Sequence, residues 1–168
     1  YLDSITTVPL DVHLMVQDVE SYIKSYLIFE PNMLTIHLEA AKNKQELLQW
    51  IHNIKQANCR AGISIKPDTP VEDIYDILPY LHHVLIMTVE PGKGGQKLIP
   101  ETITKIQKLH EYLQENKLEI DIEADGGINP DNIRQIEEAG ADIVVAGTSI
   151  INAENFKQAI MSLKGRSF

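Results

Sequence analysis

The chain has 168 residues, of which 43% are hydrophobic and 23% charged, as is typical of one globular domain with a substantial core. Its net charge of −9 argues against nonspecific binding to nucleic acid or to an anionic membrane, but it leaves room for a local phosphate site. No apolar run approaches the roughly 20 residues of a membrane span, so we expect no membrane partner, and we expect no signal peptide. The single cysteine, Cys59, cannot form an internal disulfide. A cytoplasmic protein is therefore predicted.

Six segments that look like strands alternate with segments that look like helices. Strands are predicted at residues 10–16, 33–39, 61–66, 83–89, 120–125 and 142–146. A helix is predicted after each strand, with starts marked by the capping patterns Asn43 to Glu46, Thr69 to Glu72 and Asn129-Pro130. Six consecutive units of about 25 residues, with no linker between them, imply a parallel sheet in a single domain that covers residues 1–168.

The fifth predicted strand places three carboxylates, Asp121, Glu123 and Asp125, on one face. In an open doubly wound sheet both faces are buried under helices, and such a row of charges would be costly. The lumen of a closed barrel can hold a polar site, and two other strands also carry polar side chains near their C-terminal ends. The pattern therefore favours a barrel. A (β/α)₈ barrel needs eight strands and typically about 250 residues, so six strands indicate an incomplete barrel or a fragment.

Glycine-rich turns follow three of the predicted strands. They are Gly92, Gly94 and Gly95 around Lys93, then Gly126-Gly127, then Gly147-Thr148. Glycines let backbone N–H groups converge on an anion, and barrels often bind phosphate at the ends of their last strands. The alternative is that each glycine only makes a tight turn. Three such turns on successive strands favour a phosphate site.

His13 lies on one predicted strand and Asp125 at the end of another, and the two could share a metal ion. A lone histidine on such a strand is more often a core residue, but histidine with a carboxylate is a common ligand set for divalent metals. His37 and Glu39 could complete the ligand set, or they could form structural hydrogen bonds in the lumen wall. The residues alone leave both interpretations open.

Six motifs together resemble the ribulose-phosphate 3-epimerase family. They are Asp11-Val12-His13-Leu14-Met15-Val16, His37-Leu38-Glu39-Ala40, Lys66-Pro67-Asp68-Thr69-Pro70, Met87-Thr88-Val89-Glu90-Pro91-Gly92-Lys93-Gly94-Gly95-Gln96, Glu123-Ala124-Asp125-Gly126-Gly127-Ile128 and Ala146-Gly147-Thr148-Ser149. The resemblance implies a (β/α)₈ TIM barrel of the ribulose-phosphate-binding type, with six of its eight units in this chain. It also implies interconversion of D-ribulose 5-phosphate and D-xylulose 5-phosphate in the pentose phosphate pathway.

By the same resemblance, one divalent metal ion (Zn, Fe, Mn or Co) serves the reaction. His13 and Asp125 would be two of its ligands, Asp125 would also be a catalytic acid or base, and Met15 and Met87 would line the apolar side. The residues implied to bind the substrate are His13, Gly92, Lys93, Gly94, Gly95, Asp125, Gly126, Gly127, Gly147 and Thr148. Lys93 departs from the family, which usually has an aromatic residue there.

The family pattern also implies two β/α units ahead of the first strand, with a His-x-Asp pair that supplies the remaining metal ligands and the second acid/base aspartate. We expect this domain to be N-terminally incomplete. Because the neighbouring strands would have unpaired edges, we expect a homo-oligomer. Two alternatives remain: a 3-epimerase of a ketohexose 6-phosphate such as allulose 6-phosphate, and a non-catalytic phosphate-binding remnant or pseudoenzyme.

Overall fold

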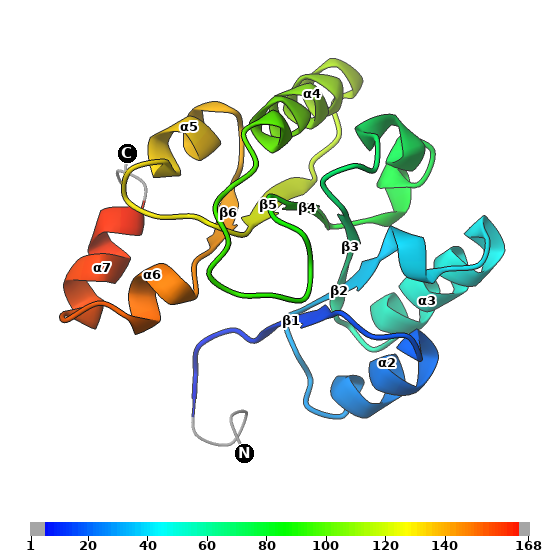
Figure 1. Cartoon of the computed structure of the whole chain (residues 1–168). Helices are drawn as coiled ribbons and strands as arrows, with labels where there is room; N and C mark the ends of the chain where they lie inside the picture. Colours follow the sequence, from blue (N-terminus) through cyan, green and yellow to red (C-terminus); the bar gives the residue numbers. More distant parts are fainter. Residues whose placement is uncertain (1–5, 165–168) are drawn as a thin grey trace.

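The computed structural model describes residues 6–164, which form a curled parallel sheet with helices on its outer side (Figure 1). The strands are β1 (Asp11–Leu14), β2 (Met33–His37), β3 (Arg60–Ile65), β4 (His83–Met87), β5 (Asp121–Asp125) and β6 (Ile143–Val145). The α-helices are α2 (Val19–Leu27), α3 (Lys44–Gln56), α4 (Glu101–Asn116), α5 (Ile133–Glu138), α6 (Thr148–Ile151) and α7 (Phe156–Leu163). Three short 3₁₀ helices, η1 (Leu38–Ala40), η2 (Val71–Ile74) and η3 (Leu78–Tyr80), complete the description.

Each strand pairs in parallel with its neighbours in the sequence, in the order β1 to β6. Alternation along each strand sends one row of side chains outward to the helices and the other row into the lumen. The outward row, with Leu34, Ile36 and Ile63, belongs to the main hydrophobic core between sheet and helices. The predicted barrel architecture is confirmed for these six units, and β1 and β6 form the two edges of the described sheet.

Helices α2 and α3 both begin after a residue whose side chain caps the helix. Asp18 accepts a hydrogen bond from the Ser21 N–H at the start of α2, and Asn43 accepts one from the Glu46 N–H at the start of α3. The Glu46 carboxylate accepts from the Lys42 N–H, one residue before the position that a capping box requires. The predicted cap at Asn43 is therefore confirmed, although the reciprocal bond of α3 is shifted, and α2 has a side-chain cap at Asp18 as well.

Two predicted helix starts are wrong, because the capping residues make other contacts, a tertiary one at Thr69 and a local one at Asn129. Thr69 donates its hydroxyl hydrogen to Glu39, and only the short helix η2 follows it. Asn129 accepts from the Asp131 N–H and forms a local turn, so that α5 begins at Ile133. The strands 33–39 and 83–89 are also shorter than predicted and end at His37 and Met87.

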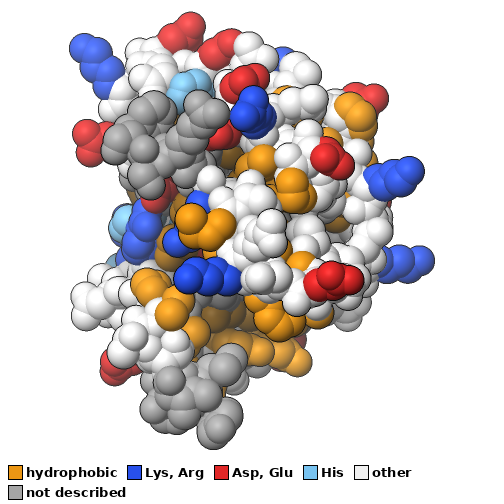
Figure 2. Space-filling view, turned by 90° about the vertical axis from the view of Figure 1, so that its left-hand side faces the viewer, with side chains coloured by type: hydrophobic (Ala, Val, Ile, Leu, Met, Phe, Trp, Pro, Cys, Tyr) orange, Lys and Arg blue, Asp and Glu red, His pale blue; other side chains and the backbone are white. Residues whose placement is uncertain are grey.

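The side of the molecule where the described sheet is open carries hydrophobic side chains on its surface. Figure 2 shows this side, with orange side chains gathered in and around a hollow. Several exposed hydrophobic residues belong to β6, α6 and α7, namely Val145, Ile151, Phe156, Ile160 and Met161. Among the described residues, no helix combines the length and apolar character that a membrane crossing requires.

Candidate active site

A cavity of about 920 Å³ lies at the C-terminal ends of β4, β5 and β6. The loop between β4 and α4 crosses in front of these strand ends (Figure 1). All three glycine turns line the cavity, as do Lys93, Asp125 and Thr148, and Met15 and Met87 contribute apolar surface. Segments more than 50 residues apart in the sequence thus meet in one place, at the face where barrel enzymes hold their substrates.

The Gly126-Gly127 turn is fixed by its neighbours on every side. Both glycines have positive φ, and a Cβ on Gly127 would lie 2.3 Å from the Leu98 backbone nitrogen. The Gly126 carbonyl accepts from the Thr88 hydroxyl at 2.6 Å, and the Gly127 carbonyl accepts from the Asn132 amide at 2.9 Å. Glycine is required here because the two loops touch through their backbones, which leaves no room for a side chain.

The loop from Glu90 to Gln96 is closed by one side chain. The Gln96 amide donates to the Glu90 carbonyl at 2.6 Å and to the Lys93 carbonyl at 2.7 Å. Gly92 and Gly95 take positive φ inside this loop, and Lys93 is exposed on it. The loop therefore has its shape before any ligand arrives.

His13 and Asp125 face each other across the lumen, from the middle of β1 and the end of β5. Nδ1 of His13 lies 3.7 Å from a carboxylate oxygen of Asp125, and the two side chains are 15% and 22% exposed. The backbone of Asp125 is held in place because its carbonyl accepts from the Thr88 N–H at 2.8 Å. The structure therefore brings together the two residues for which the sequence predicts a shared metal ion.

His37 and Glu39 continue the row behind His13. Nε2 of His37 lies 2.9 Å from Nε2 of His13, and the two rings are stacked with their centroids 4.9 Å apart. Nδ1 of His37 lies 3.4 Å from Glu39, whose other oxygen accepts from the Lys66 N–H at 2.9 Å and the Thr69 hydroxyl at 2.5 Å. We call Asp125, His13, His37 and Glu39 the mouth cluster.

The hydrogen bonds of Glu39 determine which nitrogen of each ring carries a hydrogen. Burial alone would raise the pKa of Glu39, but hydrogen bonds from His37, from the Lys66 N–H and from Thr69 lower it to about 2. An ionised carboxylate only accepts, so Nδ1 of His37 donates to it. With both rings neutral, Nε2 of His37 accepts from Nε2 of His13. Nδ1 of His13 is then left with a free lone pair directed at Asp125.

Lys105 of α4 supports the same region from the other side. Its partly buried ammonium group donates to the carbonyls of Lys66, Pro67 and Thr69 at 2.6–2.7 Å. Burial lowers the pKa of Lys105, and the negative charges of Asp68 and Glu39 oppose that effect. The segment 66–69 is thus held by Lys105 through its carbonyls and by Glu39 through its donors.

Several of these contacts were not predicted from the sequence. Of the two interpretations of Glu39, the structure favours the structural one, since both of its oxygens already accept hydrogen bonds. Neither Gln96 nor Lys105 belongs to a pattern that indicates its role, because their partners are backbone carbonyls, in the same loop for Gln96 and in a distant segment for Lys105. The strand alternation could also have identified Asp11 and Glu123 as lumen-facing polar residues. They precede His13 and Asp125 by two residues and therefore lie on the same faces of their strands.

The chain is similar in sequence to known proteins. The chain matches the sequence family described as the Ribulose-phosphate 3 epimerase family over residues 1–151. The ribulose-phosphate 3-epimerase of Mycobacterium tuberculosis strain H37Rv is 38% identical over 161 residues, which are 96% of this chain and 69% of that relative. The chain belongs to the ribulose-phosphate 3-epimerase family.

Other members of the ribulose-phosphate 3-epimerase family align over nearly the whole chain. The Escherichia coli K12 enzyme is 35% identical over 158 residues, which cover 94% of this chain and 69% of that protein. The Eremothecium gossypii enzyme is 39% identical over 154 residues, covering 92% and 62%. The residues of the cavity and of the mouth cluster lie within the part of the chain that matches the family, residues 1–151.

Solved structures with a similar fold are more distant in sequence. A 3-hexulose-6-phosphate synthase superposes with a TM-score of 0.64 at 14% identity, over 87% of this chain and 67% of that one. A mutant tryptophan synthase alpha-subunit from Pyrococcus furiosus gives a TM-score of 0.67 at 11% identity, over 95% and 68%. At such identities the likeness concerns the fold alone, and it agrees with the barrel architecture of the epimerase family.

Proposed function

We propose that this site epimerises C3 of a ketose phosphate and interconverts D-ribulose 5-phosphate and D-xylulose 5-phosphate. The observation that carries the proposal is the position of Asp125, which ends β5 between the His13 imidazole and the glycine-lined cavity. A carboxylate at the wall of a cavity that suits a sugar phosphate can exchange a proton with a bound carbon atom. Family membership supports this reaction over the others that barrels perform.

Asp125 is proposed to act on one face of the substrate as base or acid. The Thr88 N–H donates to the Asp125 carbonyl, which fixes the backbone from which the carboxylate extends. Epimerisation removes the C3 hydrogen from one face and returns a hydrogen to the other, which requires a second acid/base group on the opposite side. The sequence resemblance implies that this group is an aspartate outside the present chain.

His13 and Asp125 also fit two ligands of a divalent metal ion. Both present acceptor atoms, a ring nitrogen with a free lone pair and a carboxylate oxygen, only 3.7 Å apart. Two acceptors this close are favourable when a cation lies between them. When bound, the metal would supply a Lewis acid that stabilises the negative charge developing on the sugar oxygens. His37 and Glu39 hold His13 in the form that such a metal needs.

The three glycine turns are proposed to bind the substrate, chiefly its phosphate group. Their backbones meet around one cavity, and Lys93 adds a positive charge at its rim. The apolar surface of Met15 and Met87 lines the same cavity, where it would pack against the carbon chain of the sugar. The phosphate end and the reacting end of the substrate are thereby given different surroundings.

A kinetic assay tests the proposed function. Protein that includes the two preceding β/α units implied by the family pattern is loaded with Mn²⁺ or Zn²⁺ and given D-ribulose 5-phosphate, and formation of D-xylulose 5-phosphate is followed. Turnover that the Asp125→Asn substitution abolishes supports the proposal. Wild-type turnover in that variant would contradict the role of Asp125.

The same assay separates the alternatives. Faster conversion of D-allulose 6-phosphate than of D-ribulose 5-phosphate would assign the hexose reaction. Binding of either sugar phosphate without turnover would assign the non-catalytic phosphate-binding alternative.

Self-association stays a prediction, and the structure gives a physical reason to expect it. In the described sheet, β1 and β6 are edge strands, and exposed hydrophobic side chains such as Ile151 and Phe156 lie beside β6. Light scattering across a dilution series measures the oligomeric state. A monomer at all concentrations would contradict the prediction.

A further inference from the structure

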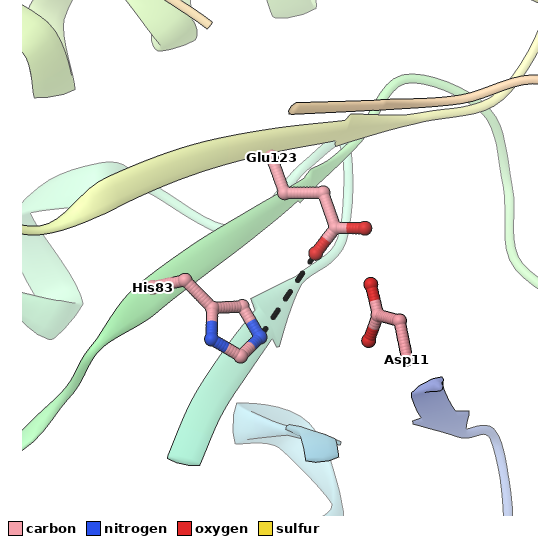
Figure 3. Close-up of side chains that lie close together, drawn as sticks. All are labelled: Asp11, His83 and Glu123. Carbon is pink, nitrogen blue, oxygen red and sulfur yellow. Dashed lines mark ion pairs between the residues drawn. The ribbon is translucent and has the colours of Figure 1, made fainter. Parts of the chain in front are cut away.

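A second group of polar side chains lies in the lumen below the mouth cluster. It consists of Asp11 at the start of β1, His83 at the start of β4 and Glu123 in the middle of β5 (Figure 3). One ligand atom from each lies within 4.8 Å of the others, and Nε2 of His83 is 3.9 Å from an oxygen of Glu123. We call these three residues the floor cluster. None of them belongs to the mouth cluster or lines the cavity.

The floor cluster contains buried polar atoms without partners. Glu123 is 1% exposed and His83 is 0% exposed. Within residues 6–164, three buried atoms of the cluster have no hydrogen-bond partner. They are both carboxylate oxygens of Glu123 and Nδ1 of His83. A buried carboxylate that accepts no hydrogen bond is strongly unfavourable, so such groups are normally paired or coordinate a metal. Figure 3 shows Glu123, Asp11 and the Nε2 side of the His83 ring directed toward one another.

Gly62 gives the His83 ring its place in the lumen. A Cβ atom on this residue of β3 would lie 2.1 Å from Nε2 of His83, so even alanine would displace the ring. The Thr35 hydroxyl lies 2.6 Å from the same nitrogen. When it donates its hydrogen there, Nε2 is kept unprotonated, which is the form that binds a metal. A cation would compete with only this one neutral hydrogen bond for the lone pair.

We propose that Asp11, His83 and Glu123 form a second divalent cation site, separate from the one at His13 and Asp125. Two carboxylates with one imidazole suit Zn²⁺ or Mn²⁺ better than Mg²⁺ or Ca²⁺, which prefer oxygen ligands alone. Two ligands of a tetrahedral zinc ion lie about 3.4 Å apart. Nε2 of His83 lies 3.9 Å from Glu123 and the three ligand atoms lie within 4.8 Å of one another, so ion binding would draw the side chains together by up to about 1.4 Å. Asp11 is exposed and gives the ion a route from solvent.

A bound cation would give Glu123 the partner that the described chain does not provide. It would also link β1 to β4 and β5 across the lumen. In the described sheet β1 pairs with β2, so no strand pairing joins it to β4 or β5. The expected role is therefore structural, with the ion holding the first strand against the opposite wall. Such an ion would stabilise the protein by binding only its folded state.

Titration with Co²⁺ tests the second site, because the visible absorption of Co²⁺ reports its ligands. The experiment starts from His13→Asn protein, in which the mouth site is removed. One equivalent of Co²⁺ should still bind and raise the melting temperature. Adding Glu123→Gln or Asp11→Asn should weaken this binding at least about tenfold, since even outer partners of a metal ligand contribute 10- to 100-fold. Adding His83→Leu should abolish the absorption bands.

Asp121→Asn is the matched control. Asp121 lies on the same face of β5 as Glu123, but it pairs with Arg60 at 2.5 Å and lies outside the floor cluster. In the His13→Asn background it should leave Co²⁺ binding unchanged. Absence of a bound equivalent in the His13→Asn protein, or equal affinity with and without Glu123→Gln and Asp11→Asn, would overturn the proposal. Because the readout is metal binding, failure of the epimerase assay would not affect it. Circular dichroism confirms that each variant is folded.

Discussion

The mouth cluster and the floor cluster treat buried polar groups in opposite ways. At the mouth, Glu39, His37 and His13 form a row in which each acceptor has a donor, and only the last lone pair, toward Asp125, is left open. At the floor, Glu123 and His83 are more deeply buried and still have unpartnered atoms within the described chain. The mouth is preorganised by the protein itself, whereas the floor needs a partner from outside. This difference makes the two clusters separable by experiment.

The largest expected effect is the loss of catalysis on changing the end of the mouth row. Asp125→Asn keeps the shape of the side chain but removes its ability to exchange a proton. We expect kcat for ribulose 5-phosphate to fall by about 10²- to 10⁴-fold, the usual contribution of an acid/base group. Asp121→Asn, on the same face of the same strand but paired with Arg60, should retain most of the activity. Equal losses of kcat in the two variants would contradict a specific acid/base role of Asp125.

The next effect concerns Glu39, which should act through His37 and His13 without touching the substrate. Glu39→Gln presents either an oxygen or an amide group to His37, so the hydrogen on Nδ1 of His37 is no longer dictated. We expect metal affinity at the mouth to fall about 10- to 100-fold. Nitrogen NMR of the metal-free protein should show His13 changing from one tautomer to a mixture. Thr69→Val removes one hydrogen bond to Glu39 but leaves its carboxylate facing His37, so it is the control.

In metal-free protein, Glu123 of the floor cluster should make the free energy of unfolding depend on pH. Burial, and then the negative charges of Asp11 and Asp125, raise the pKa of Glu123 from 4.5 to about 8. The folded state therefore binds a proton that the unfolded state has lost, and the resulting stability is fully present below pH 4.5 and lost as the pH rises toward 8. Burial also lowers the pKa of His83 to about 4, which opposes this trend below pH 6.5.

Above pH 6.5 Glu123 acts without that opposition. Between pH 6.5 and 8 we expect the free energy of unfolding to fall by about 2 kcal/mol more in the wild type than in Glu123→Gln. Urea denaturation in the presence of a chelator measures the difference. Parallel curves for the two proteins would show that Glu123 is solvated or already paired. Added Zn²⁺ should remove the difference, because a cation favours the ionised carboxylate.

The smallest expected effect is on the loop over the cavity. Gln96→Ala removes two hydrogen bonds that close the loop, each contributing about 1 kcal/mol. We expect KM to rise about three- to tenfold with little change in kcat, because the loop holds the substrate and does not perform the proton transfer. Gln107→Ala, which removes an exposed pair with Glu111 on α4, should leave both constants unchanged. A fall in kcat alone would place the loop in the chemistry.

The sequence predicts the alternation of β5 and the gathering of three glycine turns, since both follow from rules local to a strand and its end. It does not predict the floor cluster. His83 begins a nearly all-apolar strand, and its approach to Glu123 depends on how β4 and β5 align. The helix expected at Thr69 fails for a similar reason, because Glu39, 30 residues earlier, takes the capping hydroxyl. Local patterns identify which face a residue occupies, whereas its partners depend on strand register and on distant loops.

The contacts of Lys105 have a consequence for the order of folding. Its ammonium group binds carbonyls 36 to 39 positions earlier in the chain, so the segment 66–69 cannot reach its final form before α4 packs against the sheet. Glu39 depends on that segment for two of its donors. The row of imidazoles should therefore become ordered late, after the central strands have paired, since closing long loops slows folding. Substitutions at Glu39 and Lys105 should accelerate unfolding far more than they slow folding, which stopped-flow chevron plots would show as low φ-values.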